Sequence, residues 1–410
     1  MGDDFFPSSV PEGRTPVYFF TRNYYPILTG ATERFRRYLP GLSERGVDFY
    51  VVTTLNDASL PEVEDTGVER ILRVPLKGSG YVDIEQLIMP MFDELERAAP
   101  GTIQVFGFNS RMRQQLKRLR RFGHQILLVR TMMPSFQPPR LSLRGIRKSL
   151  RTRLDAASVD RITAGSTVMR DAFSLGSERL RQQYAIIPHG IDVERFRPPA
   201  DEIEKHHLRK ELGLRDGAFI LLSVGSVMER KRTHLAVEAF LQLGREAPDV
   251  QLVVIGENQV RDTLAADQHR DSFSRYCLRV NETAGRCPPG SVVFAGEVEN
   301  IEDYYRAADL FVFTSSIEGM PNAMIEAMAS GLPCVTTPFR GLPETEFGKS
   351  GQEFLLSGDG ATEIAAEVLG LMNDGARRAA IGQAARRFAS SNLDSGSAID
   401  AYARVYHREV

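Results

Sequence analysis

The stretch that decides the fold is LFVFTSSIEGMPNAMIEAMASGLPCVTT, residues 310–337. It predicts a buried strand at 310–315, a loop that holds Gly319 and Pro321, a helix that begins at about Asn322, and a second strand at 332–337. The two apolar runs lack polar alternation, which is typical of parallel strands covered by helices on both faces. The stretch therefore indicates a doubly wound α/β architecture.

The same alternation of apolar runs and helical spacers extends in both directions from this stretch. Further strands are predicted at 17–21, 48–55, 70–75, 102–108, 125–132, 161–166, 184–188, 219–226, 250–256 and 291–296. The segment PHGIDVERFRPPADE at 188–202 contains three prolines and predicts a linker. We expect two domains, 1–190 and 191–391, and the C-terminal helix at 392–410 is a candidate to complete the first.

Composition excludes several classes of protein. The chain has 410 residues, 42% hydrophobic and 25% charged, which argues against a disordered, fibrous or small disulfide-rich protein. No run of about 18 apolar residues predicts a membrane-spanning helix. The three cysteines lack CxxC spacing, and the N-terminus lacks the pattern of a signal peptide. We therefore expect a cytoplasmic protein without a zinc site.

Charge is unevenly distributed along the chain. Residues 1–190 carry a net charge of +7, and residues 111–153 contain thirteen Lys or Arg and no Asp or Glu. The part at 140–153 interleaves Leu and Ile with Arg. Two interpretations stay open: a solvated basic face, or contact with an acidic acceptor or an anionic membrane at its inner face. Nucleic acid is not expected, because aromatic residues are scarce in these stretches and the whole chain is acidic.

Two acidic residues in the opening stretch are candidates for ligand binding. Glu318 lies in the predicted loop, and Glu326 lies one turn inside the helix. The free N–H groups and positive dipole of a helix start can hold a phosphate, and carboxylates can accept hydrogen bonds from sugar hydroxyls. Gly319 would let a ligand approach the backbone closely. A single Glu near a helix start often only offsets the dipole, so neither residue alone indicates a function.

The whole string is more specific than either residue. Glu318 and Glu326, with GMPN between them and AMASGLP after, resemble the E-x7-E signature of retaining GT-B glycosyltransferases of family four, the glycosyl transferases group 1. Similar family segments are IIPHGIDVERFRP (186–198), LLSVGSVMERKRTHLAVEAF (221–240), VVFAGEVENIEDYYRAADLFVFTSS (292–316) and PILTGATERFRRYLPGLSERGVDFYVVT (26–53). The resemblance implies the GT-B fold: two Rossmann-like doubly wound domains facing across a cleft, an N-terminal one for the acceptor and a C-terminal one for a nucleotide-sugar donor.

The resemblance also implies roles for individual residues. Lys231 would neutralise the donor diphosphate and Glu318 would lie near the transferred sugar, so these two are the candidate catalytic residues. Glu326 would bind the ribose hydroxyls. The full set expected at the donor is Gly30, Ser226, Arg230, Lys231, Glu318, Gly319, Met320, Asn322, Ala323 and Glu326. On the acceptor side the expected residues are Thr29, Arg130 and Thr131, and Thr29 and Gly30 would lie in a glycine loop.

The sequence departs from the family pattern at two places. Ser226 stands where the family has an arginine, so Lys231 lacks its cationic companion unless Arg230 or Arg232 replaces it. The usual histidine after the fifth N-terminal strand is absent, and Arg130, Thr131 and Met132 occupy that region. The other histidines are interpreted as structural or solvated: His124 as a turn residue, His189 as part of the linker, and His206–His207 as an exposed helix face.

The function implied by the resemblance is that of a retaining, hexosyltransferase-type glycosyltransferase. It would need no metal and no cofactor, because Lys231 and the helix dipole would carry the diphosphate. The acceptor would be a small molecule, a glycan or a lipid-linked molecule. The alternatives are a non-catalytic nucleotide-sugar or glycan-binding protein, or a nucleotide-sugar epimerase or phosphorylase of the same fold.

Overall fold

The computed structural model describes residues 5–26, 29–75, 83–134, 142–244, 247, 249–258 and 272–409. The chain divides into two compact units, unit 1 with Met1–Gly190 and Ser395–Val410, and unit 2 with Ile191–Asp394. The boundaries expected from the sequence were 190/191 and 391/392. No helix in the described ranges combines the length and the apolar character that crossing a membrane requires.

Unit 1 is built on one eight-stranded sheet of order β3-β4-β2-β1-β5-β6-β7-β8. Its strands are β1 (Thr15–Phe20), β2 (Val47–Thr54), β3 (Val63–Asp65), β4 (Glu69–Val74), β5 (Thr102–Val105), β6 (Gln125–Val129), β7 (Arg161–Ala164) and β8 (Tyr184–Ile186). All pairs are parallel except β3 with β4. The central position of β1 makes this a doubly wound sheet, as expected. The antiparallel edge strand β3 was not predicted.

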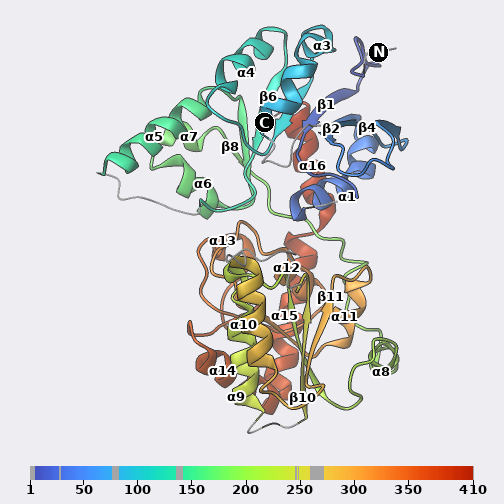
Figure 1. Ribbon diagram of the computed structural model, residues 1–410, viewed down its shortest axis with the longest axis vertical. Coiled ribbons are helices and arrows are strands. Elements are labelled where there is room, and N and C mark those ends of the chain that lie inside the picture. Colours follow the sequence, from blue (N-terminus) through green and yellow to red (C-terminus); the bar gives the residue numbers. More distant parts are fainter. Residues whose placement is uncertain are drawn as a thin grey trace, which may run out of the picture. The chain divides into compact units, whose positions relative to one another are not determined.

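Helices cover both faces of the unit 1 sheet. They are α1 (Gly30–Glu44), α2 (Glu85–Ile88), η1 (Met89–Met91), α3 (Phe92–Arg97), α4 (Met112–Arg121), α5 (Leu143–Ala156), α6 (Thr167–Ser174), α7 (Glu178–Arg181) and α16 (Ser395–Tyr406). Strand β1 sends Val17 and Phe19 into one core, and the alternate residues into the other. The first core also holds Tyr402 and Tyr406, so the C-terminal helix α16 packs beside α1 in this unit (Figure 1).

Unit 2 is built on a six-stranded, fully parallel sheet of order β11-β10-β9-β12-β13-β14. Its strands are β9 (Phe219–Val224), β10 (Val250–Ile255), β11 (Val292–Gly296), β12 (Leu310–Phe313), β13 (Cys334–Thr336) and β14 (Leu355–Leu356). In chain order this is 3-2-1-4-5-6, the arrangement of the dinucleotide-binding Rossmann fold. The strand order reverses between β9 and β12.

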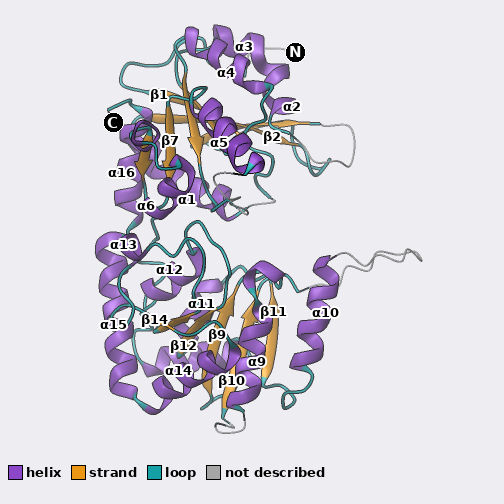
Figure 2. Cartoon of the chain, turned by 90° about the vertical axis from the view of Figure 1, so that its left-hand side faces the viewer, coloured by secondary structure: helices purple, strands orange, loops and turns teal. Residues whose placement is uncertain are grey.

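Helices flank the unit 2 sheet on both sides (Figure 2). They are α8 (Glu202–Glu211), η2 (Glu229–Lys231), α9 (Thr233–Leu243), α10 (Ser272–Ala284), α11 (Ile301–Ala307), α12 (Asn322–Ala329), α13 (Glu344–Phe347), α14 (Ala361–Asn373) and α15 (Gly375–Asn392). Buried Ile220 and Leu222 of β9 face one core, and Leu221 faces the other, as in a sheet covered on both faces. Between β10 and β11, residues 259–271 lie outside the described part.

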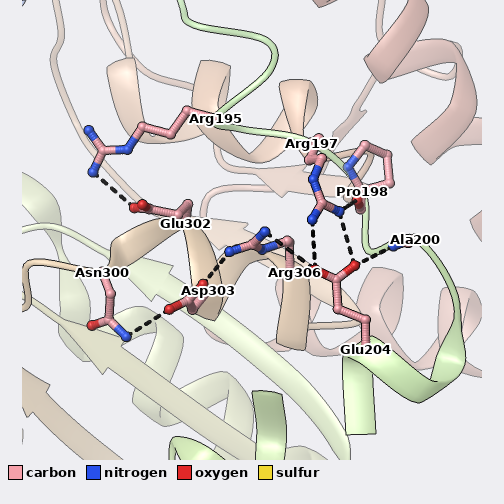
Figure 3. Close-up of polar contacts among 9 residues, drawn as sticks. All are labelled: Arg195, Arg197, Pro198, Ala200, Glu204, Asn300, Glu302, Asp303 and Arg306. Atoms are coloured by element: carbon pink, nitrogen blue, oxygen red, sulfur yellow. Dashed lines mark hydrogen bonds and ion pairs between the residues drawn. The ribbon is translucent and has the colours of Figure 1, made fainter. Parts of the chain in front are cut away.

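The start of unit 2 is fastened by a network of charged side chains (Figure 3). Arg197 donates to both carboxylate oxygens of Glu204 on α8, at 2.8 and 3.0 Å, and the backbone N–H of Ala200 donates to the same carboxylate. Arg306 of α11 lies 3.4 Å from Glu204. The Arg197 hydrogen bonds, followed by that from Ala200, lower the pKa of Glu204 to about 2. The predicted linker is therefore ordered against α8 and α11 from Ile191 onward.

Candidate functional site

The candidate site of unit 2 lies at the carboxyl ends of β9 and β12, where the strand order reverses. Helix α9, after β9, packs in one core of unit 2, and α12, after β12, packs in the other, so the chain leaves the two strands toward opposite faces of the sheet. This is the place where open α/β sheets bind ligands. Lys231 follows β9 and Glu318 follows β12, so the topology alone brings the two predicted catalytic residues to one edge.

Hydrogen bonds join the two loops directly. The N–H of Ser316 donates to the carbonyl of Arg230 at 2.8 Å, and the hydroxyl of Thr314 donates to the carbonyl of Lys231 at 2.8 Å. On its other side, the loop after β12 pairs with the segment after β13: Glu318 N–H donates to Arg340 O at 3.1 Å. These bonds fix the backbone on either side of Lys231 and Glu318.

One carboxylate oxygen gathers three donors at this edge. Oε1 of Glu318 accepts from Arg230 Nη1 at 2.7 Å, from Lys231 Nζ at 2.8 Å and from Ser315 Oγ at 2.8 Å. The Glu318 side chain is 6% exposed, whereas those of Lys231 and Arg230 are 19% and 31% exposed. The buried acid therefore holds two cations whose remaining donors can reach a ligand. Two positive charges against one negative charge favour an oxyanion at this position.

Arg230 donates to the same carboxylate oxygen as Lys231. The sequence left Arg230 and Arg232 as alternatives for the arginine that Ser226 replaces. Arg232 instead adopts a left-handed backbone, φ 49°, and donates to Thr314 O at 2.7 Å and to Thr337 Oγ1 at 2.7 Å. Arg232 therefore positions the loop after β12, and Arg230 reaches Glu318. Ser226 lies half-buried in the loop after β9.

Two glycines allow Lys231 to lie against the end of the sheet. A Cβ at Gly225 would lie 3.1 Å from Cε of Lys231, and φ at Gly225 is +142°. A Cβ at Gly256, after β10, would lie 2.5 Å from the backbone carbon of Gly225. Neither position accepts a side chain without displacement, so the close packing of the β9 and β10 ends depends on glycine.

Glu326 belongs to a different part of the same helix start. Its Oε2 accepts a hydrogen bond at 2.9 Å from the hydroxyl of Tyr305, a fully buried residue of α11. The same hydroxyl lies 3.0 Å from the carbonyl of Ala323. Tyr305 therefore holds the Glu326 carboxylate at a fixed place on α12. Glu326 lies within α12, whereas Glu318 lies in the loop before this helix, so the two acids occupy different elements of the site.

Helix α12 begins at Asn322, as expected, but some N–H groups of its first turn already donate to backbone carbonyls. The N–H groups of Asn322 and Met324 donate to Met320 O at 3.1 Å and to Pro321 O at 2.9 Å. Within the described part of the chain, the N–H groups of Gly319, Met320 and Ala323 donate to no other residue. These three groups could bind an anion at the helix start.

Of the residues expected in unit 1, Gly30 differs from its expected setting. It is the first residue of helix α1 rather than part of a loop. Thr29 is the N-cap: its hydroxyl accepts from Thr32 N at 3.2 Å, and its N–H donates to Thr32 Oγ1 at 2.8 Å. A reciprocal capping box explains the difference, because it starts the helix one residue after Thr29.

Arg130, expected on the acceptor side, follows β6 and lines a basic cavity of unit 1. Its guanidinium lies 4.4 Å from the centre of the Phe173 ring. Arg130 also donates a hydrogen bond to the Tyr184 hydroxyl. Burial raises the pKa of Tyr184, and the hydrogen bond from Arg130 partly offsets this rise. Thr131 comes directly after Arg130 and is half-buried; it is not among the residues that line the cavity.

The histidines have structural or exposed settings. His124 is buried, accepts from Gly101 N at 3.3 Å and lies 2.7 Å from Leu95 O, and burial lowers its pKa. It joins helix α3 to the segment that precedes β5. His206 and His207 are exposed on α8. Across the described ranges, no three His, Cys, Asp or Glu side chains gather in a way that could hold a metal ion.

Four contributors were missed from the sequence: Ser315, Tyr305, Gly225 and Gly256. The run Thr314-Ser315-Ser316 directly after a buried strand was a usable signal, because hydroxyls at a strand's carboxyl end often contact a site. Gly225 could have been found from its place after β9. Tyr305 gave no local signal, because its partner Glu326 lies 21 residues away and depends on how α11 packs.

A comparison with family models identifies the segment that carries this site. Residues 218–374 match the model of the glycosyl transferases group 1. The family resemblance expected from the sequence is confirmed for this segment, which holds Lys231, Glu318 and Glu326.

Two characterised relatives resemble about half of the chain or more. The lipopolysaccharide core biosynthesis mannosyltransferase LpsB of Rhizobium meliloti is 32% identical over 222 residues, covering 54% of this chain and 60% of that protein. A GDP-mannose-dependent monoacylated alpha-(1-6)-phosphatidylinositol monomannoside mannosyltransferase of Corynebacterium glutamicum is 27% identical over 253 residues, covering 60% of each. The chain thus spans about 60% of the length of these relatives.

Solved structures show the fold of the whole chain. Anabaena Alr3699/HepE, solved in complex with UDP and glucose, superimposes with a TM-score of 0.72 at 17% identity, covering 96% of this chain and 100% of that one. The two doubly wound units and this likeness confirm the expected GT-B class of fold.

Proposed function

We propose that the chain transfers a glycosyl group from a nucleotide-sugar to an acceptor hydroxyl, with retention at the anomeric carbon. The observation that carries the proposal is the convergence of Arg230 and Lys231 on the buried Glu318 at the switch point of unit 2. It supplies fixed positive charge where a diphosphate leaving group would develop negative charge. The names of the relatives, both mannosyltransferases, support the same class of reaction.

Each part of the site has a role in this reaction. Lys231 and Arg230 would neutralise the nucleoside diphosphate, and the N–H groups of Gly319, Met320 and Ala323 would bind the donor. Glu326, held by Tyr305, would accept hydrogen bonds from the ribose hydroxyls. The bond between the anomeric carbon and the diphosphate oxygen breaks, the acceptor oxygen bonds to that carbon on the same face, and the leaving phosphate takes the acceptor proton.

The state of Glu318 argues against a covalent intermediate on this residue. Its Oε1 accepts three hydrogen bonds, two of them from cations. Such bonds stabilise the carboxylate and make it a weaker nucleophile. We therefore assign Glu318 an electrostatic and positioning role beside the transferred sugar. We also propose that the reaction needs no metal ion and no cofactor, since the two cations supply the charge.

The proposal is tested by a screen of UDP-, GDP-, ADP- and dTDP-sugars. Thermal shift identifies the donor that binds, and release of the nucleoside diphosphate is then measured with and without EDTA. We expect one donor class to bind and to turn over in EDTA with retained configuration in the product. A nucleotide-sugar that binds without turnover would favour the non-catalytic alternative, and an epimerised sugar the epimerase. No binding and no turnover would overturn the proposal.

We further propose that the chain is cytoplasmic and contacts an anionic membrane surface through α5. The apolar residues of α5 follow a helical spacing of three, four and four and form one stripe. They are exposed by 78, 54, 58 and 43% at Leu143, Ile146, Leu150 and Leu154. In this fourteen-residue helix the buried residues are Gly145 and Ala156. The stripe is therefore open, with cations beside it.

Charge favours a lipid surface as the occupant of this stripe. Helix α5 carries five Lys or Arg and one Asp. Arg144, Arg147 and Arg153 form no ion pair with any described residue. By contrast, Arg113 and Arg120, at either end of α4, pair with Asp155 and Asp160. The open part of the basic stretch is thus α5, whereas residues 135–141 lie outside the described part.

The membrane proposal is tested by sedimentation with vesicles. We expect the protein to bind vesicles that contain phosphatidylglycerol more tightly than vesicles of phosphatidylcholine alone. Leu150→Ser should weaken this binding about tenfold, since burying a leucine contributes about 1.5–3 kcal/mol. Ile203→Ser on α8, which removes an apolar side chain of unit 2 that is even more exposed than Leu150, is the control. Equal binding to both vesicle types, or no effect of Leu150→Ser, would refute it.

A further inference from the structure

The basic cavity of unit 1 lies at the carboxyl ends of two parallel strands. Its volume is about 550 Å³, and its described lining residues are Gly107, Phe108, Leu128, Arg130, Arg147, Lys148, Arg151, Thr152, Asp155 and Phe173. Gly107 and Phe108 follow β5, Leu128 lies at the end of β6, and Arg130 directly follows β6. Strand β5 pairs with β1, where the strand order of unit 1 reverses, and β6 pairs with the other side of β5. The cavity thus lies at the carboxyl edge of the sheet, beside the switch point, and doubly wound sheets bind ligands along this edge.

The lining carries an excess of positive charge. The lining contains four cationic side chains and a single carboxylate, that of Asp155. The Asp155 carboxylate accepts a hydrogen bond at 2.8 Å from Nε of Arg113, which does not line the cavity. Arg151, which does line it, lies farther from this carboxylate, at 3.8 Å. Arg147 forms no ion pair with a described residue. The lining therefore keeps a net positive charge, which favours an anionic ligand.

The donors in the cavity suit an anion with several oxygens that can each accept a hydrogen bond. Arg130 is stacked on the Phe173 ring at 4.4 Å, which fixes the plane of its guanidinium. Its Nε is buried and has no hydrogen-bond partner among the described residues. Arginine binds phosphate oxygens in pairs, and lysine adds a point charge. Phe108 and Phe173 give an apolar wall beside the charged groups.

A second basic cavity in unit 1 shows the contrast. It has a volume of about 540 Å³ and lies at the amino end of β6, lined in part by Arg120, Arg121 and Arg408. Arg120 pairs with Asp160 at 2.7 Å, and Arg408 donates to Gly123 O at 2.6 Å. Its cations are largely used to hold the fold together.

We propose that the cavity lined by Arg130 and Arg147 binds a phosphate group, as a phosphomonoester or phosphodiester. This inference rests on the proposed function: the phosphate would be part of the acceptor, and its binding would place the acceptor on unit 1. The same chemistry could come from a soluble phosphorylated molecule or from a lipid headgroup.

The test is ligand-observed NMR with glycerol 3-phosphate and with monomeric dihexanoyl phosphatidic acid, and with glycerol as the probe without phosphate. We expect saturable binding of a phosphate probe and none of glycerol. Tighter binding of glycerol 3-phosphate identifies a soluble acceptor, and tighter binding of the phosphatidic acid a lipid-linked one. Either outcome supports the cavity as a phosphate site.

Variants separate this cavity from the donor site. Arg147→Glu changes an exposed side chain and should weaken probe binding more than tenfold, since a charge-assisted hydrogen bond is lost and repulsion added. Arg130→Gln should do the same. Arg121→Ala, in the second cavity, and Lys231→Ala should leave probe binding unchanged, while Lys231→Ala weakens nucleotide binding.

Several results would overturn the inference. These are absence of binding of both probes, equal binding by wild type and Arg147→Glu, or loss of binding in Lys231→Ala, which would place the anion in unit 2. Failure of the donor screen with intact probe binding would instead refute the proposed function alone.

Discussion

At the scale of single residues, the site is organised around one oxygen atom, Oε1 of Glu318. Three donors meet there, from the segment after β9 and from the loop that carries Glu318 itself. Glu318 is buried, whereas Lys231 and Arg230 are partly exposed. The carboxylate therefore holds the two cations in place while part of each remains accessible to a ligand. The pair Lys231 and Arg230 is thereby preorganised, and preorganised charge stabilises a leaving group without reorganisation during the reaction.

Lys231→Ala tests this role. Removing one preorganised donor typically costs about 3 kcal/mol in the barrier, so turnover of the donor should fall by roughly two to three orders of magnitude. Lys210→Ala, at an exposed lysine of α8, is the matched control and should retain full turnover. The release of nucleoside diphosphate is the measurement. An equal rate in wild type and Lys231→Ala would remove Lys231 from the mechanism.

At the scale of elements, the ends of β9, β10 and β12 set the geometry. Gly225 and Gly256 let β9 and β10 end in close contact, and Lys231 lies over Gly225. Hydrogen bonds from the loop after β12 then tie that loop to Arg230 and Lys231. The position of each charged side chain thus follows from strand order and from the absence of a Cβ at two places.

Gly225→Ala should displace Lys231 and weaken nucleotide binding. The new methyl group would lie 3.1 Å from Cε of Lys231, and the backbone at φ +142° disfavours any side chain. Gly217→Ala is the control for backbone strain alone, because Gly217 has φ +76° and no atom lies within 4 Å of the place that its new methyl group would take. Calorimetric titration with the nucleotide should show a weaker Kd for Gly225→Ala only. Similar loss in both variants would contradict the packing account.

Acid should release the segment that begins unit 2. Hydrogen bonds from Arg197 and Ala200 lower the pKa of Glu204 from 4.5 to about 2 in the folded chain. A lowered folded-state pKa stabilises the fold above the unfolded value, and this contribution is lost as pH falls from about 4.5 toward 2. The Tm advantage of wild type over Glu204→Gln should therefore shrink across this window. A constant difference in Tm would show that Glu204 is not responsible.

At the scale of the whole molecule, two sheets of the same winding carry different chemistry. Unit 2 places Lys231, Arg230 and Glu318 at its switch point, and unit 1 places a basic cavity beside its own. Helix α16 comes last in the chain but packs in unit 1. The chain thus enters unit 2 at Ile191 and leaves it at Asp394, where Ile191 N–H donates to Leu393 O at 2.7 Å.

Local patterns predicted most of this architecture. The apolar runs gave the doubly wound fold, and the string at 310–337 gave the start of α12 and the two acidic residues. The short strand β3 and the contact of Glu326 with Tyr305 could not be predicted, because they depend on packing between distant segments. The choice of Arg230 over Arg232 depended on a left-handed backbone at Arg232. These features depend on tertiary structure, so the pattern of apolar residues along the sequence does not predict them.

The most direct measurement of the central claim is hydrogen exchange with the nucleotide that the donor screen identifies. Binding should slow exchange in 225–232 and in 314–326, because the N–H groups of Gly319, Met320 and Ala323 gain acceptors. Exchange in these segments should stay fast in Lys231→Ala at the same nucleotide concentration. Saturating nucleotide that leaves both segments unprotected, or protects only segments of unit 1, would contradict a donor site at the ends of β9 and β12.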